Sequence, residues 1–82
     1  MGLDGVNDGA KLLAAWSRAV GPGLAVHTRP QGIRRGVVHV TVRDSAWMQR
    51  MQMEKAHVLE ELRRELGSEQ VRDLRLRIAP MS

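Results

Sequence analysis

The sequence contains no cysteine, phenylalanine or tyrosine, and its only aromatic residues besides histidine are Trp16 and Trp47. Without cysteine the chain can form neither a disulfide nor a thiolate site. Its 82 residues suffice for one small domain, whose core must be built from aliphatic residues, Met and Ala around two indoles. No apolar run approaches the roughly 20 residues of a membrane span, and the N-terminus has no signal-peptide pattern. We therefore expect a cytoplasmic protein without a membrane partner.

Residue groupings typical of enzymes are also missing. The histidines, His27, His39 and His57, do not occur at the spacing of metal ligands. Ser45 is better placed to cap a helix than to act as a nucleophile, and no two acids share an apolar face as an acid–base pair requires. The glycines form no phosphate-binding pattern. We predict a non-enzymatic protein with no catalytic residue, metal, cofactor or small-molecule substrate.

Two stretches alternate apolar residues with polar or cationic ones, VHVTVR at 38–43 and LRLRI at 74–78. Side chains on a strand point to opposite faces with a period of two. Each stretch would therefore bury Val, Leu or Ile on one face and expose Arg, His or Thr on the other. If both strands lie in one sheet, its outer face is cationic, which favours binding of a polyanion over a catalytic pocket.

The first part of the chain predicts a helix. Residues 1–7 show no periodicity, which indicates a flexible start, and Asp8 is a candidate N-cap. Apolar residues then recur at three- and four-residue spacing over residues 12–20, as on one face of a helix. Gly21-Pro22-Gly23 would end this helix, because Gly suits the left-handed cap and Pro cannot continue the helix.

The middle of the chain predicts a hairpin followed by a long helix. Pro30 removes a backbone donor, so the first strand should lie at an edge or carry a bulge. Gly36 would supply the positive φ of the hairpin turn. Asp44 or Ser45 would cap the second helix, which should run to about Leu66.

A last strand at residues 71–78 completes the order helix, strand, strand, helix, strand. We predict an α+β fold, a two-layer domain over residues 8–80 whose small sheet carries both helices on its apolar face. The pattern leaves open whether the third strand pairs with the first or the second.

Arginine dominates the cations of this chain, whose formal net charge is +4. Guanidinium groups bind phosphate bidentately and stay charged. With no Phe, Tyr or Trp on the predicted sheet face, phosphate contact with weak sequence preference is expected, not base stacking. An alternative is a solvated strand face that resists edge aggregation. The candidate nucleic-acid-binding residues are Arg34, Arg35, Arg43, Arg72, Arg75 and Arg77, with Arg72 and also Arg29 expected at the rim.

Methionines at the start of the second helix indicate a second candidate surface. Met48, Met51 and Met53 cluster beside Trp47. Such flexible side chains fill irregular cores and also line adaptable protein interfaces. Met48 and Met51 fit the core stripe, whereas Met53 lies off it. Trp47 and Met53 are therefore the candidate partner-binding residues, with core filling as the alternative.

Several motifs together resemble the DciA family of bacterial replication proteins. They are Trp-x-x-x-Val-Gly at 16–21, Leu-Ala-Val-His-Thr-Arg-Pro at 24–30, the strand at 36–42, Asp-Ser-Ala-Trp at 44–47 and Leu-Gly at 66–67. The resemblance extends over residues 12–78. Both tryptophans match the family, and we expect both to hold the helices to the sheet.

The resemblance implies a KH-like domain and a role in replication initiation. Its implied partners are the replicative DNA helicase DnaB, whose loading it would promote without ATPase activity of its own, and single-stranded or forked DNA. The alternative is a free-standing KH-like nucleic-acid-binding module, with RNA as a candidate ligand and no helicase contact.

Overall fold

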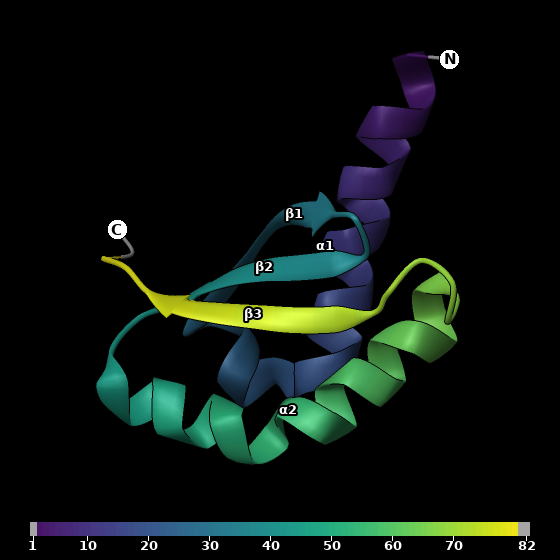
Figure 1. The fold of residues 1–82 in the computed structure, drawn as a ribbon. Coiled ribbons are helices and arrows are strands. Elements are labelled where there is room, and N and C mark those ends of the chain that lie inside the picture. The colour runs from purple at the N-terminus through teal and green to yellow at the C-terminus, as the bar shows by residue number, and fades with distance from the viewer. Residues whose placement is uncertain (1, 81–82) are drawn as a thin grey trace.

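The computed structural model describes residues 2–80, with side chains from residue 9 onward. These residues form a three-stranded sheet. Figure 1 shows both helices on one side of this sheet, and the first turns of α1 extending past it. The α+β fold and the order of elements are therefore confirmed. The elements are α1 (Gly2–Ala25), β1 (Thr28–Arg34), β2 (Val37–Val42), α2 (Ser45–Leu66) and β3 (Asp73–Ile78).

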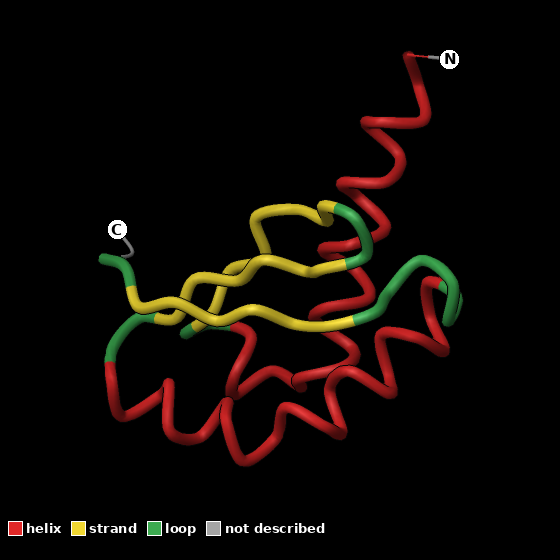
Figure 2. The backbone as a smooth tube through the Cα atoms, viewed as in Figure 1, coloured by secondary structure: helices red, strands yellow, loops and turns green. Residues whose placement is uncertain are grey.

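The sheet has the strand order β1-β2-β3, with β2 antiparallel to β1 and parallel to β3. Figure 2 shows the short turn from β1 to β2 and the long return through α2 to β3. This crossover is what a parallel pair requires, and it answers the pairing question that the sequence left open. Both expectations for Pro30 are confirmed, because β1 is an edge strand and its register shifts between Pro30 and Gly32.

The ends of α1 differ in how well local sequence predicts them. The helix begins at Gly2, so the prediction that Asp8 caps it is wrong. An existing helix extends at little cost, because each added residue gains one hydrogen bond. Flexibility of residues 1–7 stays a prediction. The end at Gly21 is confirmed, since its φ of 82° interrupts the helix and only a last turn follows.

The other turns and caps follow local sequence closely. Arg35 and Gly36 both have positive φ, at 52° and 81°, as a tight two-residue hairpin turn requires. Asp44 caps α2, and its side chain accepts a hydrogen bond from the Trp47 amide at 3.1 Å. The last strand begins at Asp73, two residues later than predicted.

The core lies between the helices and the apolar face of the sheet. Trp16 is 2% exposed, and its Nε1 donates to the Thr28 hydroxyl at 2.8 Å, which in turn donates to the Leu24 carbonyl at 2.8 Å. This relay satisfies the buried polar atoms and joins α1 to β1. The buried side chains include Leu12, Ala15 and Ala19 of α1, Val38, Val40 and Val42 of β2, Met51, Val58 and Leu62 of α2, and Leu74 of β3.

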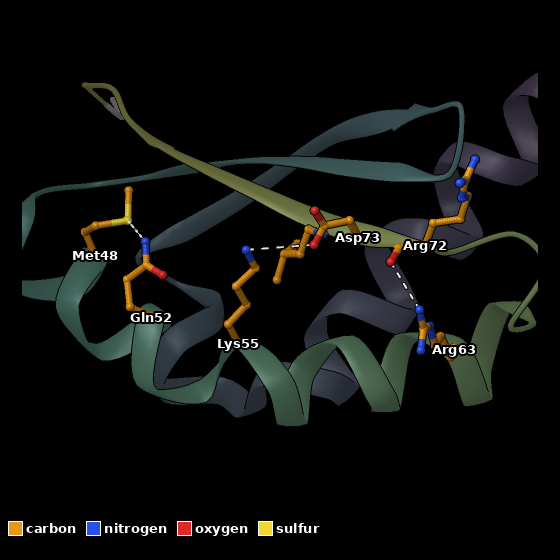
Figure 3. Close-up of polar contacts among 7 residues, drawn as sticks. Met48, Gln52, Lys55, Arg63, Arg72 and Asp73 are labelled. Atoms are coloured by element: carbon orange, nitrogen blue, oxygen red, sulfur yellow. Dashed lines mark hydrogen bonds and ion pairs between the residues drawn. The ribbon is translucent and has the colours of Figure 1, made fainter.

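Arg63 joins the end of α2 to the segment before β3. Its Nε donates to the Val71 carbonyl at 2.9 Å. Its terminal nitrogen donates to the Arg72 carbonyl at 3.1 Å, as Figure 3 shows. These bonds satisfy two carbonyls of a segment that forms no regular secondary structure. Arg63 therefore has a structural role that its neighbour Arg64 lacks.

Replacing Arg63 with alanine should destabilise the fold by about 1 to 2 kcal/mol, because two charge-assisted hydrogen bonds are lost. Arg64→Ala is the matched control. Among the described side chains, its guanidinium forms ion pairs only within α2, with Glu60 and Glu61, so its loss should change stability by less than about 0.5 kcal/mol. Urea unfolding followed by circular dichroism measures both variants. Equal losses would contradict the structural role of Arg63.

Candidate nucleic-acid interface

The face of the sheet turned away from the helices is defined by the strand registers. Side chains of paired residues point to the same side of a sheet, and neighbours along a strand point to opposite sides. Val38, Val40 and Val42 of β2 are buried in the core. The alternate residues of β2, which are Val37, His39 and Thr41, therefore lie on the outer face together with their partners on β1 and β3. These outer rows are Arg29–Thr41–Arg77, Gly32–His39–Arg75 and Arg34–Val37–Asp73.

Four arginines from β1 and β3 share this outer face, and we call Arg29, Arg34, Arg75 and Arg77 the arginine face. All four are exposed. Among the side chains described, none of the four forms an ion pair with an acid. Asp73, which belongs to one of the rows, lies 3.8 Å from the Lys55 ammonium instead. The positive charge of the arginine face is therefore not neutralised by these carboxylates.

The centre of the arginine face is polar and closely packed. Thr41 is only 7% exposed, although no helix covers it. Its hydroxyl accepts a hydrogen bond from Gln31 Nε2 at 3.1 Å and donates to the Arg29 carbonyl at 3.3 Å. The three rows contain no Trp on which a base could stack. This arrangement can bind phosphates with guanidinium groups but offers little means of reading bases.

Arg43 lies at one end of the sheet, beyond the last residue of β2. Its terminal nitrogen is 3.3 Å from Nδ1 of His27. The His27 ring stacks on Trp47, with ring centroids 3.9 Å apart and an angle of 14° between the planes. The chain turns here toward the N-cap of α2, so Arg43 borders the arginine face instead of projecting from its strands as expected.

Arg35 and Arg72 lie at the opposite end. Arg35 is in the hairpin turn, and the Arg72 amide donates to the Gly36 carbonyl at 2.7 Å. The Arg72 stem crosses Gly36 so closely that an added Cβ there would lie 2.6 Å from its Cγ. Arg72 therefore flanks the hairpin turn, as a residue at the rim.

Of the six predicted arginines, the structure thus brings Arg34, Arg75 and Arg77 onto one face. Arg29, which we expected at the rim, belongs with them because it shares a row with Arg77. The alternation of apolar and polar residues along β1 is obscured in the sequence, because the bulge after Pro30 adds a residue to this strand.

The two candidate partner-binding residues lie on α2. Trp47 is partly buried against the core, and Met53 is 81% exposed. The prediction that Met51 fills the core is confirmed, since it is fully buried. Trp16 and Trp47 both link a helix to the start of β1, through a hydrogen bond and a ring stack respectively. A role of Trp47 and Met53 in partner binding stays a prediction.

The part of the chain that the structure describes has neither a membrane-spanning helix nor a cluster of metal ligands. No described helix combines the length and hydropathy needed to cross a membrane. Described His, Asp and Glu side chains form no group of three that could hold a metal ion. The arginine face is the largest cluster of like-charged side chains on the described sheet.

Comparison with known proteins places the chain in a family. Residues 2–76 match the family described as Dna[CI] antecedent, DciA. A UPF0232 protein of Rhodococcus jostii is 30% identical over 65 residues, which cover 79% of this chain and 35% of that protein. A UPF0232 protein of Mycobacterium tuberculosis is 31% identical, with the same coverage. The chain spans about a third of the length of these relatives. The resemblance seen in the sequence is confirmed, and the chain belongs to the DciA family.

Proposed function

We propose that the protein is a non-enzymatic replication-initiation factor, which binds DNA through the arginine face and promotes loading of the replicative helicase DnaB. Membership in the DciA family supports a role in replication. The observation that carries the DNA part is the gathering of four exposed arginines on one uncovered sheet face, none of them in an ion pair with a described acid. A KH-like domain and a cytoplasmic location belong to the same proposal.

Phosphate contact is the chemistry that the arginine face supports best. Arg75 and Arg77 are two residues apart on β3, which separates them by about 6.6 Å along the strand. One nucleic-acid strand can therefore contact both. Each guanidinium that neutralises a phosphate releases counterions, which drives binding without regard to base sequence. Such indifference suits a factor that acts on DNA of many sequences.

The helicase contact is proposed for the helical layer. Met53 is exposed on α2, and α2 lies on the side of the sheet opposite the arginine face (Figure 1). DNA on the sheet and a protein on α2 would therefore not compete for the same surface. Exposed methionine suits such a contact, because its flexible thioether adapts to the shape of a partner.

The helicase part is tested with the purified chain, its cognate replicative helicase and forked DNA. We expect the chain to co-elute with the helicase and to speed its entry onto the fork. Met53→Glu should weaken co-elution about tenfold, as expected for loss of a central apolar contact. Gln49→Glu places the same charge at another exposed position of α2 and serves as the control.

Two outcomes would contradict this assignment. If Met53→Glu and Gln49→Glu behave alike, the contact lies elsewhere on the chain. If the wild-type chain has no effect on its helicase but binds RNA tightly, the alternative function as a free-standing KH-like nucleic-acid-binding module is favoured.

A further inference from the structure

The two edges of the sheet are protected unequally. Pro30 and the register shift that follows it interrupt the edge of β1. On β3 the register with β2 is continuous from Asp73 to Ile78, and the strand contains no proline. Proteins commonly blunt a free edge, because its unpaired backbone groups accept another strand. The edge of β3 is thus the open one.

Backbone hydrogen bonds show which residues of β3 face outward. The Asp73 amide donates to the Gly36 carbonyl at 3.2 Å, and the Ala79 amide donates to the Val42 carbonyl at 3.1 Å. Because alternate residues of a strand bond to the same neighbour, odd-numbered residues bond to β2 and even-numbered ones point away from it.

Only the first outward amide of β3 is satisfied by a side chain. The Leu74 amide donates to the Asp73 carboxylate at 2.8 Å. The outward backbone groups of Leu76 and Ile78 form no comparable bond to another described residue. The free part of the edge therefore runs from Leu76 to the end of β3.

Apolar side chains flank the free edge on the helical side. Ile78 is 51% exposed and Leu76 is partly buried. Figure 3 shows Met48 and Gln52 extending from α2 toward the sheet, with Gln52 Nε2 3.7 Å from the Met48 sulfur. Arg75 and Arg77 project on the opposite, outer side of the same strand. The edge thus combines free backbone groups, an apolar inner side and a cationic outer side.

We propose that β3 accepts an extended segment of a partner protein as a fourth strand, and that this segment alternates acidic with apolar residues. Its backbone would bond to Leu76 and Ile78. Its acids would lie beside Arg75 and Arg77, and its apolar side chains would cover the exposed Ile78. Opposite charges on neighbouring strands stabilise a sheet, whereas like charges destabilise it.

The same rule disfavours a second copy of this chain as the occupant. Antiparallel self-pairing about Arg77, which would use the free backbone groups of Leu76 and Ile78, places the two Arg77 side chains opposite each other. Self-pairing about Leu76 places Arg75 of one copy opposite Arg77 of the other. The net charge of +4 adds repulsion between copies. This inference is independent of the proposed function, because strand addition requires neither DNA nor helicase.

The test uses a short blocked peptide of alternating Val and Glu, labelled for fluorescence anisotropy, with the intact chain. A peptide with Lys in place of Glu should bind about tenfold more weakly, because it sets like charges beside Arg75 and Arg77. Methylating the Val-Glu backbone at alternate nitrogens, those that would donate to β3, should remove binding. Hydrogen exchange by NMR should show protection of the Leu76 and Ile78 amides only with the unmethylated Val-Glu peptide.

Variants of the chain separate backbone from side-chain contributions. Ile78→Pro removes an outward amide without removing a bond to β2, and it should bind the Val-Glu peptide about tenfold more weakly than Ile78→Ala. The double variant Arg75→Glu/Arg77→Glu should prefer the Val-Lys peptide. Circular dichroism verifies that each variant is folded.

The proposal is overturned if the Val-Glu and Val-Lys peptides bind alike, or if the methylated peptide binds as well as its parent. Absence of protection at Leu76 and Ile78 with saturating Val-Glu peptide would also overturn it. These peptide experiments contain neither DNA nor helicase. A negative result would therefore overturn strand addition without contradicting the proposed DNA and helicase contacts.

Discussion

Replacing Arg75 and Arg77 together with alanine is expected to weaken binding to single-stranded DNA and to flatten its salt dependence. The four residues of the arginine face and the adjacent Arg43 could contact about five phosphates, which predicts a log–log salt slope of about −3.5. Loss of two contacts should reduce the slope to about −2.1 and lower affinity between about tenfold and a hundredfold near 50 mM salt. Anisotropy titrations at several salt concentrations measure both quantities.

The matched control for charge is the double variant Arg50→Ala/Arg64→Ala. It removes an equal number of positive charges, two, from α2, where both guanidiniums form ion pairs with glutamates of the same helix. Its salt slope should stay close to that of the unmodified chain. An unchanged slope for the Arg75/Arg77 variant, or an equal fall in the control, would show that DNA binds elsewhere. Neither double variant alters a buried residue, so urea unfolding should show both to be folded.

Replacing Trp16 with alanine is expected to remove a large part of the stability of the domain. Truncating a buried Trp costs about 3 to 5 kcal/mol, because contacts are lost and a cavity remains. A chain of 82 residues has only about 4 to 12 kcal/mol of stability. Trp16→Ala should therefore be largely unfolded at modest urea concentrations, as far-ultraviolet circular dichroism would show.

Two further variants separate the parts of this effect. Thr28→Val keeps the indole but deprives its N–H of the only acceptor that the structure gives it, which should destabilise the fold by about 1 to 3 kcal/mol. Trp47→Ala should destabilise it less than Trp16→Ala, because Trp47 is only partly buried. If the two variants lose equal stability, the difference in burial between Trp16 and Trp47 does not determine their contributions.

Much of the fold could be predicted because its signals are local. Gly21 adopts positive φ where a helix is interrupted, and Gly36 does so in the hairpin turn. The Asp44 side chain accepts the hydrogen bond from a backbone amide that is expected of an N-cap. The apolar stripe of α2 is confirmed by the burial of Met51, Val58 and Leu62. Each of these features depends on residues a few positions apart. The spacing of apolar residues along a helix and the residue types favoured at turns and caps therefore suffice to predict it.

The candidate site was predicted less completely, because its residues come from strands distant in the sequence. Arg75 and Arg77 were found from the alternation of β3 alone. Arg29 was not, since the bulge in β1 breaks that alternation. Arg43 follows the alternation of β2 yet lies at the end of the sheet beside His27, because the chain there leaves the strand for the next helix.

The sequence by itself determined that this chain forms two-faced strands with arginine on one side and aliphatic residues on the other. It also determined two helices whose stripes can cover the aliphatic side. Only the tertiary structure decided that β3 pairs in parallel with β2, which sets Arg77 in one row with Arg29 and leaves an open edge at Leu76 and Ile78. The physical reason is that local periodicity selects the face of each side chain, whereas strand register depends on how α2 packs across the sheet.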